Sequence, residues 1–295
     1  MRLVIAAILL TSCATSSGSP VATNSQDPLV SRFGTPGPPP PVTERSTESS
    51  DGVSVMDLSF GEGAAATDAY LVRPDGANPA AGILFFHWVE YGSPTSNRTE
   101  FLEEATELAR HDVVSLLVDG RFPWKESPSS VEHDVAAVEA DVDMLRHGLD
   151  VLRSQAGMDP ARIAMVGHDF GAMYSSIVFG ADPAPVGLVM MAPTARWADW
   201  FLRYWRIDDP EEDYLAAMAP LDPVTWLPRG AERPILLQFA DHDQYVFEAV
   251  AAEIASAAGA TAEVRKYDAG HELSEEARAE RAEWLADLLE LPRAS

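Results

Sequence analysis

The stretch MDPARIAMVGHDFGA, residues 158–172, predicts a buried strand, a sharp turn and a helix in immediate succession. Residues 161–168 within it are a mostly apolar run, which is typical of a strand that is covered on both faces of a sheet. Gly167 and Gly171 flank Asp169, and glycines in this spacing allow a strained turn in which a strand and a helix approach closely. The sequence therefore places a carboxylate at the tip of a tight turn.

Strands alternate with helices along the rest of the chain from about residue 53. Segments 53–58 and 69–74 predict an antiparallel opening pair of strands. Ser274 is a predicted N-cap of the last helix. The alternation of strands with helices favours a mostly parallel sheet with helices on both faces. The other predicted strands are 81–87, 112–120, 161–168, 185–193, 233–241 and 262–268, and the predicted helices are 97–111, 133–155, 171–180, 247–259 and 274–290.

The composition narrows the classes of function. The 295 residues suit one large α/β domain or two small ones, and 46% hydrophobic residues suffice for a core. Asp and Glu total 46 against 21 Lys and Arg, so the net charge of -25 argues against a nucleic acid partner. The seven histidines lack a ligand spacing such as H-E-x-x-H, and there is no dinucleotide fingerprint. We therefore expect no metal and no cofactor.

The N-terminal part is predicted to lie outside the folded domain. An apolar run after Arg2 ends in the sequence Leu-Thr-Ser-Cys13, which resembles a bacterial lipoprotein signal over residues 1–12. An ordinary signal peptide with a chance cysteine is the alternative. Residues 13–50, rich in Pro, Ser and Thr, favour a disordered tether. The resemblance implies lipidation of Cys13 and an exported protein anchored to a membrane, in the periplasm or at the cell surface.

The strand, turn and helix around Asp169 resemble the nucleophile elbow of the α/β-hydrolase superfamily, Gly-x-nucleophile-x-Gly after a buried strand. The lead-in Asp-Pro-x-Arg-Ile at 159–163 is also common in that family. The resemblance implies the α/β-hydrolase fold for residues 51–295. The size and short connections are similar to the dienelactone hydrolase branch, which has cysteine at the elbow. The Gly-His-Asp-x-Gly pattern instead resembles epoxide hydrolases and dehalogenases, which use aspartate.

The family orders its catalytic residues as nucleophile, acid and histidine. The resemblance therefore assigns Asp169 as the nucleophile. Asp243 follows the strand 233–241 in the usual spacing of the acid, with Asp241 as the alternative. His271 follows the last strand in a Gly-His pair, which is the usual place of the base. Two carboxylates beside one imidazole are expected to raise the pKa of this histidine.

The same resemblance implies an oxyanion hole made of two backbone N–H groups. One belongs to Phe170, after the nucleophile, and the other is assigned to Trp88, in the loop after the strand 81–87. His87 is a candidate substrate-binding residue, with a buried structural histidine as the alternative. His168 is expected to be a packed neighbour of the elbow.

The segment 195–229 is dense in aromatic residues and is a candidate lid over an apolar pocket. A helical segment that packs on the domain with its aromatic side chains buried is the alternative. Trp197, Trp200 and Tyr204 are its candidate substrate-binding residues.

An aspartate nucleophile favours attack on an alkyl carbon, which displaces a halide or opens an epoxide and leaves an ester on the enzyme. We therefore expect a hydrolase that cleaves a C–O or C–halogen bond of a small apolar molecule. Ester or lactone hydrolysis is a second interpretation, with Asp169 as a general base or through an unfavourable anhydride. A catalytically inactive lipoprotein that serves as a binding or envelope module is a third.

Overall fold

The computed structural model describes residues 27–34, 37–76, 81–89, 97–120, 130–204 and 209–291. The predicted signal peptide and Cys13 lie outside these residues. The elements in chain order are η1 (Val30–Arg32), β1 (Val42–Ser50), β2 (Val53–Phe60), η2 (Gly63–Ala65), β3 (Thr67–Pro74), β4 (Ala81–Phe86), α1 (Leu102–Ala109), β5 (Val113–Val118), α2 (Val131–Arg153), β6 (Ile163–His168), α3 (Phe170–Ala181), β7 (Gly187–Met191), α4 (Trp197–Tyr204), α5 (Glu211–Met218), η4 (Ala219–Leu221), α6 (Pro223–Gly230), β8 (Ile235–Ala240), α7 (Glu248–Ala258), β9 (Glu263–Tyr267) and α8 (Glu275–Leu288). Each predicted strand and helix has a counterpart, and the Ser274 hydroxyl caps α8 as predicted.

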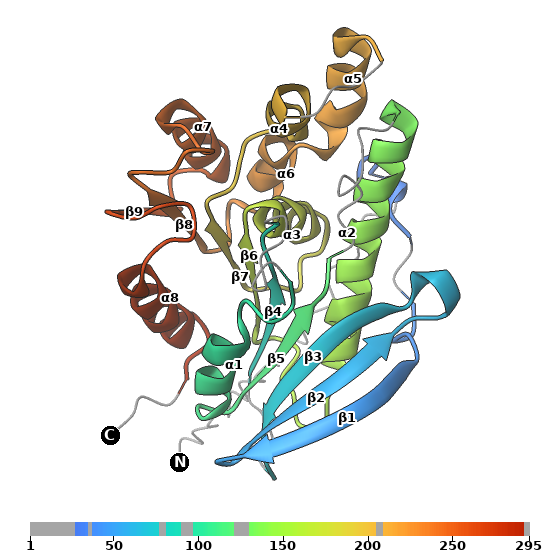
Figure 1. Cartoon of the computed structure of the whole chain (residues 1–295), viewed down its shortest axis with the longest axis vertical. Coiled ribbons are helices and arrows are strands. Elements are labelled where there is room, and N and C mark those ends of the chain that lie inside the picture. The colour runs from blue at the N-terminus through green and yellow to red at the C-terminus, as the bar shows by residue number, and fades with distance from the viewer. Residues whose placement is uncertain are drawn as a thin grey trace, which may run out of the picture.

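The centre of the fold is a nine-stranded sheet in the order β1-β2-β3-β5-β4-β6-β7-β8-β9. The strands from β5 through β4 to β9 pair in parallel, while β1, β2 and β3 are antiparallel to their neighbours. Helices α1 and α8 lie on one face, and α2 and α3 lie on the other (Figure 1). The predicted fold class, a mostly parallel sheet with helices on both faces, is confirmed.

The strand β1 corrects the predicted boundary of the tether. Residues 42–50 pair with β2 along their whole length, so the prediction of a disordered tether over 13–50 is wrong for this part. All nine residues are exposed, because β1 is an edge strand, and their polar side chains carry no apolar alternation. Asp51 and Gly52 have positive φ values of 51° and 80°, as in the Asp-Gly hairpin turn that joins such strands.

A second part of the predicted tether also packs on the domain. The Phe33 side chain is 5% exposed, and its ring centroid lies 5.4 Å from that of Trp226 on α6. The Gly34 N–H donates to the Asp143 carboxylate on α2 at 2.9 Å. Residues 27–34 are therefore held by α2 and α6.

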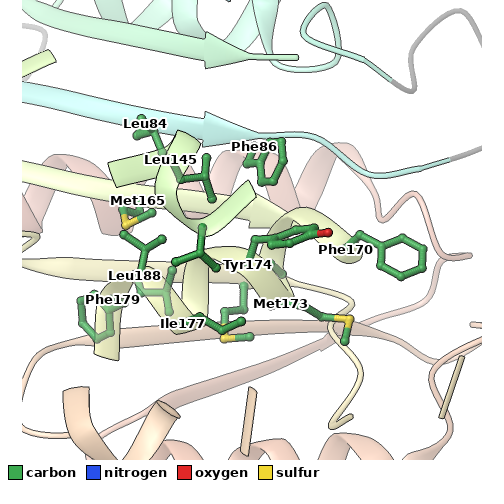
Figure 2. Packing of buried hydrophobic residues seen from close by; sticks show 14 of the residues in the cluster. Leu84, Phe86, Leu145, Met165, Phe170, Met173, Tyr174, Ile177, Phe179 and Leu188 are labelled. Atoms are coloured by element: carbon green, nitrogen blue, oxygen red, sulfur yellow. The ribbon is translucent and has the colours of Figure 1, made fainter. Parts of the chain in front are cut away.

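The core consists of two apolar layers, one on each face of the sheet. Alternate side chains of β4 serve the two layers: Leu84 and Phe86 point to the α2 and α3 side, and Ile83 and Phe85 point to the α1 and α8 side. Figure 2 shows the first layer, in which side chains of β4, β6 and β7 pack against those of α3. This packing brings the carboxyl ends of β4 and β6 together. Among the described helices, none has the length and apolar character to cross a membrane.

Candidate active site

The elbow between β6 and α3 holds Asp169 in a strained conformation, with φ 53° and ψ -117°. Its N–H donates to the carbonyl oxygen of Met191 at 2.8 Å, which ties the turn to β7. A Cβ atom on Gly167 would lie 2.4 Å from the carbonyl oxygen of Gly171, and one on Gly171 would lie 2.1 Å from that of Phe86. Both glycines are therefore required by close backbone approach, as predicted.

Asp243 and His271 form the expected pair of acid and histidine. The Nδ1 atom of His271 lies 2.8 Å from Oδ2 of Asp243. The other oxygen, Oδ1, accepts the N–H groups of Tyr245 at 2.7 Å and Val246 at 3.0 Å. Burial alone would raise the pKa of Asp243, but the hydrogen bond from His271 and these N–H groups outweigh it, and the pKa is lowered. The alternative acid, Asp241, is exposed.

The structure brings Asp169 and His271 together as predicted. The Nε2 atom of His271 lies 3.8 Å from Oδ1 of Asp169, and the two side chains are 5% and 1% exposed. Burial alone would lower the pKa of His271, but the carboxylates of Asp169 and Asp243 outweigh it and raise the pKa to about 10. The predicted direction of this shift is confirmed. At neutral pH the ring is therefore an imidazolium that lies between two carboxylates.

The backbone donors at the site differ from the prediction by one residue. The N–H of Trp88 donates to Oε2 of Glu100 at 2.8 Å, so the assignment of this N–H to the oxyanion hole is wrong. The N–H of Val89 instead faces Oδ2 of Asp169 at 3.4 Å. Phe170 is the first residue of α3, where the partial positive charge of the helix N-terminus favours an anion.

His87 is a buried structural histidine and does not contribute to the site. The N–H of Gly120 donates to its Nε2 at 2.8 Å, so the proton is on Nδ1, which donates to the carbonyl oxygen of Trp88 at 2.6 Å. The residue is 1% exposed. Its assignment to substrate binding is therefore wrong, because both ring nitrogens are engaged by the backbone.

Trp197 belongs to the core rather than to the site. It is 0% exposed, its indole N–H donates to the carbonyl oxygen of Leu221, and its ring packs behind Phe170 at 5.9 Å between centroids. Its assignment to substrate binding is wrong as well. The side chain of Tyr204 lies outside the part that the structure describes, although its backbone closes α4.

Three aromatic rings surround His271 and form what we call the aromatic box: Trp88, Trp200 and Tyr245. Their centroids lie 5.6, 6.5 and 5.0 Å from the imidazole centroid. Trp200 was assigned to substrate binding and does lie near the catalytic residues. Tyr245 was not singled out from the sequence. It follows the acid by two residues, and that proximity was its only signal.

The predicted lid segment forms α4, α5 and α6. Tyr214 and Trp226 are fully buried, as in the alternative of a packed helical segment, whereas Trp200 is part of the aromatic box beside His271. A lid function for this segment stays a prediction. In the described ranges, no group of three or more His, Cys, Asp or Glu residues is arranged to hold a metal ion.

Neither a protein-family model nor a curated protein matches the sequence. Several solved structures, however, have a similar fold. Acetyl xylan esterase 1 from Thermoanaerobacterium superposes with a TM-score of 0.70 at 13% identity, over 88% of this chain and 91% of that chain. An acetyl xylan esterase from Paenibacillus gives 0.66 at 18% identity, over 88% and 90%. A protein named as a dienelactone hydrolase, from Klebsiella pneumoniae, gives 0.59 at 15% identity, over 81% and 99%.

The chain has the α/β-hydrolase fold. Within this α/β-hydrolase fold, Asp169, Asp243 and His271 follow β6, β8 and β9, at the carboxyl ends of parallel strands. The α/β-hydrolase fold thus accounts for the meeting of residues that are far apart in the sequence. The fold does not by itself identify the bond that is cleaved.

Proposed function

We propose that the protein is a hydrolase that cleaves a C–O or C–halogen bond at an alkyl carbon of a small apolar substrate, with Asp169 as the nucleophile. The observation that carries this proposal is the unequal placement of the two carboxylate oxygens of Asp169. Oδ2 faces the N–H of Val89, while Oδ1 faces His271 and has no hydrogen-bond partner among the described residues.

This arrangement gives each oxygen one role. Oδ1 keeps its lone pairs for attack on the alkyl carbon, and the leaving group departs with the electron pair of the broken bond. Oδ2 lies where negative charge develops when water later adds to the carboxyl carbon of the ester. The N–H of Val89 and the N-terminus of α3 stabilise that charge. The aromatic box supplies apolar surroundings for an uncharged substrate.

The protonation state of His271 changes as Asp169 is esterified and then hydrolysed. The imidazolium of the resting site is stabilised by both carboxylates, and esterification of Asp169 removes one of them. The pKa of His271 then falls, and the ring releases its proton to an alkoxide leaving group or to solvent. The neutral imidazole, oriented by Asp243, accepts a proton from the water that attacks the ester. The alcohol departs with the original Oδ1 and with the second proton of that water, and the carboxylate keeps the oxygen of the water while His271 is again protonated.

The reaction class has independent support. The similar solved structures carry the names of esterases and of a dienelactone hydrolase, all of which are hydrolases. An aspartate in the elbow favours an alkyl carbon over a carboxylic ester, because attack on the latter would produce an anhydride. The proposed reaction is therefore still a hydrolysis, but the atom that Asp169 attacks is an alkyl carbon and not the carbonyl carbon of an ester.

The test follows the oxygen atoms. We expect a single turnover of 1-bromobutane or 1,2-epoxyhexane in ¹⁸O-labelled water, with enzyme in excess, to place ¹⁸O in the peptide that contains Asp169. The alcohol from that first turnover should carry unlabelled oxygen. Label in the alcohol of the first turnover would contradict the proposal, because it indicates direct attack of water. Absence of turnover with alkyl halides, epoxides and activated esters would favour the inactive binding module.

The rate of ester hydrolysis on the enzyme is expected to rise with pH between about pH 6 and pH 9. In the ester, Asp243 is the carboxylate that still favours the protonated ring of His271, so a large part of the histidine is protonated at low pH and cannot act as a base. Stopped-flow or rapid-quench decay of a preformed ester would measure this rate. Asp243→Asn removes one carboxylate, so it should move the rising limb to lower pH while lowering the plateau. A flat wild-type profile over this range would contradict the assignment of His271 as the base.

A further inference from the structure

We propose that Glu100 is a positioning residue of this site, which fixes both the loop that presents the Val89 N–H and the loop that carries His271. The inference rests on the proposed function for its kinetic consequence, and on the contacts of Glu100 for its structural content. Glu100 lies in the turn just before α1, and its side chain is 13% exposed.

The two oxygens of the Glu100 carboxylate hold two different segments. Oε2 accepts the N–H of Trp88 at 2.8 Å, in the loop after β4. Oε1 lies 2.6 Å from Nδ1 of His168, the last residue of β6 and the immediate neighbour of Asp169. The side chain of Glu100 therefore connects the loop after β4, which carries the Val89 N–H, to the elbow.

His168 extends the connection to the catalytic histidine. Its Nε2 lies 3.0 Å from the backbone carbonyl oxygen of His271, and this contact requires a proton on Nε2 because a carbonyl only accepts. The His168 ring also stacks on Trp88, with centroids 5.0 Å apart and an interplanar angle of 2°. A continuous series of contacts thus connects the loop after β4 to the loop of the catalytic histidine: Trp88 N–H to Glu100, Glu100 to His168, and His168 to the carbonyl oxygen of His271.

The contact with Trp88 determines which backbone donor faces Asp169. The N–H groups of Trp88 and Val89, in the loop after β4, point in different directions, and Glu100 accepts the N–H of Trp88. The N–H of Val89 is then the one directed at Oδ2 of Asp169. Without the carboxylate, the N–H of Trp88 would lose its acceptor, and a donor left without a partner in a partly buried site favours a change of loop conformation.

A glutamine at position 100 provides a sharp comparison with alanine. Its amide oxygen can accept the Trp88 N–H, and its amide N–H can donate to Nδ1 of a neutral His168 whose Nε2 keeps its proton. Every contact of the series would survive without the negative charge. Glu100→Gln should therefore resemble the wild type if hydrogen bonding positions the site, whereas Glu100→Ala removes all contacts at once.

The experiment measures both variants with and without substrate. With 1-bromobutane, Glu100→Ala should lower kcat roughly 10–100-fold through slower ester hydrolysis. The value of kcat/KM, which reports alkylation and earlier steps, should stay near that of the wild type, so KM falls with kcat. Glu100→Gln should restore most of kcat. Glu103→Ala is the matched control, because its carboxylate lies nearby on α1 and is 78% exposed.

The substrate-free readout is the NMR spectrum of protein labelled with ¹⁵N-valine and ¹⁵N-histidine. The Val89 amide and the His271 ring signals should move in Glu100→Ala and stay near wild-type positions in Glu100→Gln and Glu103→Ala. Unchanged signals in Glu100→Ala would overturn the proposal, as would equal losses of kcat and kcat/KM in both Glu100 variants. If the wild type forms no ester on Asp169, the proposed function fails, and the NMR comparison still decides the positioning role.

Discussion

Replacement of His271 by alanine is expected to leave the protein covalently modified at Asp169 after exposure to an alkylating substrate. Alkylation by a halide needs only the carboxylate, whereas hydrolysis of the ester needs a base that lies close to the attacking water. His271 is the imidazole that lies 3.8 Å from Oδ1 of Asp169. Its loss should slow hydrolysis by roughly 10²–10⁴-fold, so that the ester accumulates.

Intact-protein mass spectrometry would detect the adduct as the mass of the alkyl group, and peptide mapping would place it on Asp169. The double variant Asp169→Asn/His271→Ala is the control, because it keeps the rest of the site and removes the nucleophile. An adduct on that control would indicate non-specific alkylation. An unmodified His271→Ala protein, tested with a compound that the wild type turns over, would exclude a covalent ester on Asp169.

Gly171→Ala is expected to destabilise the whole domain. The new Cβ would lie 2.1 Å from the carbonyl oxygen of Phe86 and 2.5 Å from that of His87. These are backbone atoms, so relief requires α3 to move away from the end of β4. We expect the free energy of unfolding to fall by about 3 kcal/mol or more, at the upper end of the range for overpacked sites.

Denaturant titration followed by circular dichroism would measure this change. Gly37→Ala is the matched control, because a Cβ at that position meets no atom of the described residues within 4 Å and Gly37 is not among the glycines with positive φ. A Gly171→Ala variant as stable as this control would mean that the elbow and β4 are further apart than the structure places them.

The sequence was sufficient to predict the parts of the molecule whose physical causes are local. The elbow follows from two glycines around Asp169 at the junction of an apolar strand and a helix. Asp243 and His271 could be assigned because the resemblance connects them to strand ends, and parallel strands end at the same edge of a sheet. These predictions needed no knowledge of side-chain packing.

The errors arose where a residue's role depends on partners that are distant in sequence. Trp88 and Val89 are adjacent, and only the side chain of Glu100 distinguishes their N–H groups. Trp197 and Trp200 are on the same helix, yet one is covered by Leu221 and Phe170 while the other faces Tyr245. Aromatic density could not separate these two environments.

The missed strand β1 has a different cause. An edge strand exposed on both faces has no requirement for apolar residues, so its composition resembles that of a linker. The Asp51-Gly52 pair was the available signal, because this dipeptide is typical of a two-residue hairpin turn.

The near-complete burial of Asp169 and His271 has a kinetic consequence. Only 1% and 5% of these two side chains is in contact with solvent, and the rings of Trp200 and Tyr245 lie close to the imidazole of His271. Those two rings stack on each other with centroids 5.2 Å apart. A substrate can therefore reach the Asp169 carboxylate only after side chains that cover it move. Water for the second half of the cycle meets the same burial, so the rate at which the covering side chains move is an upper limit on turnover.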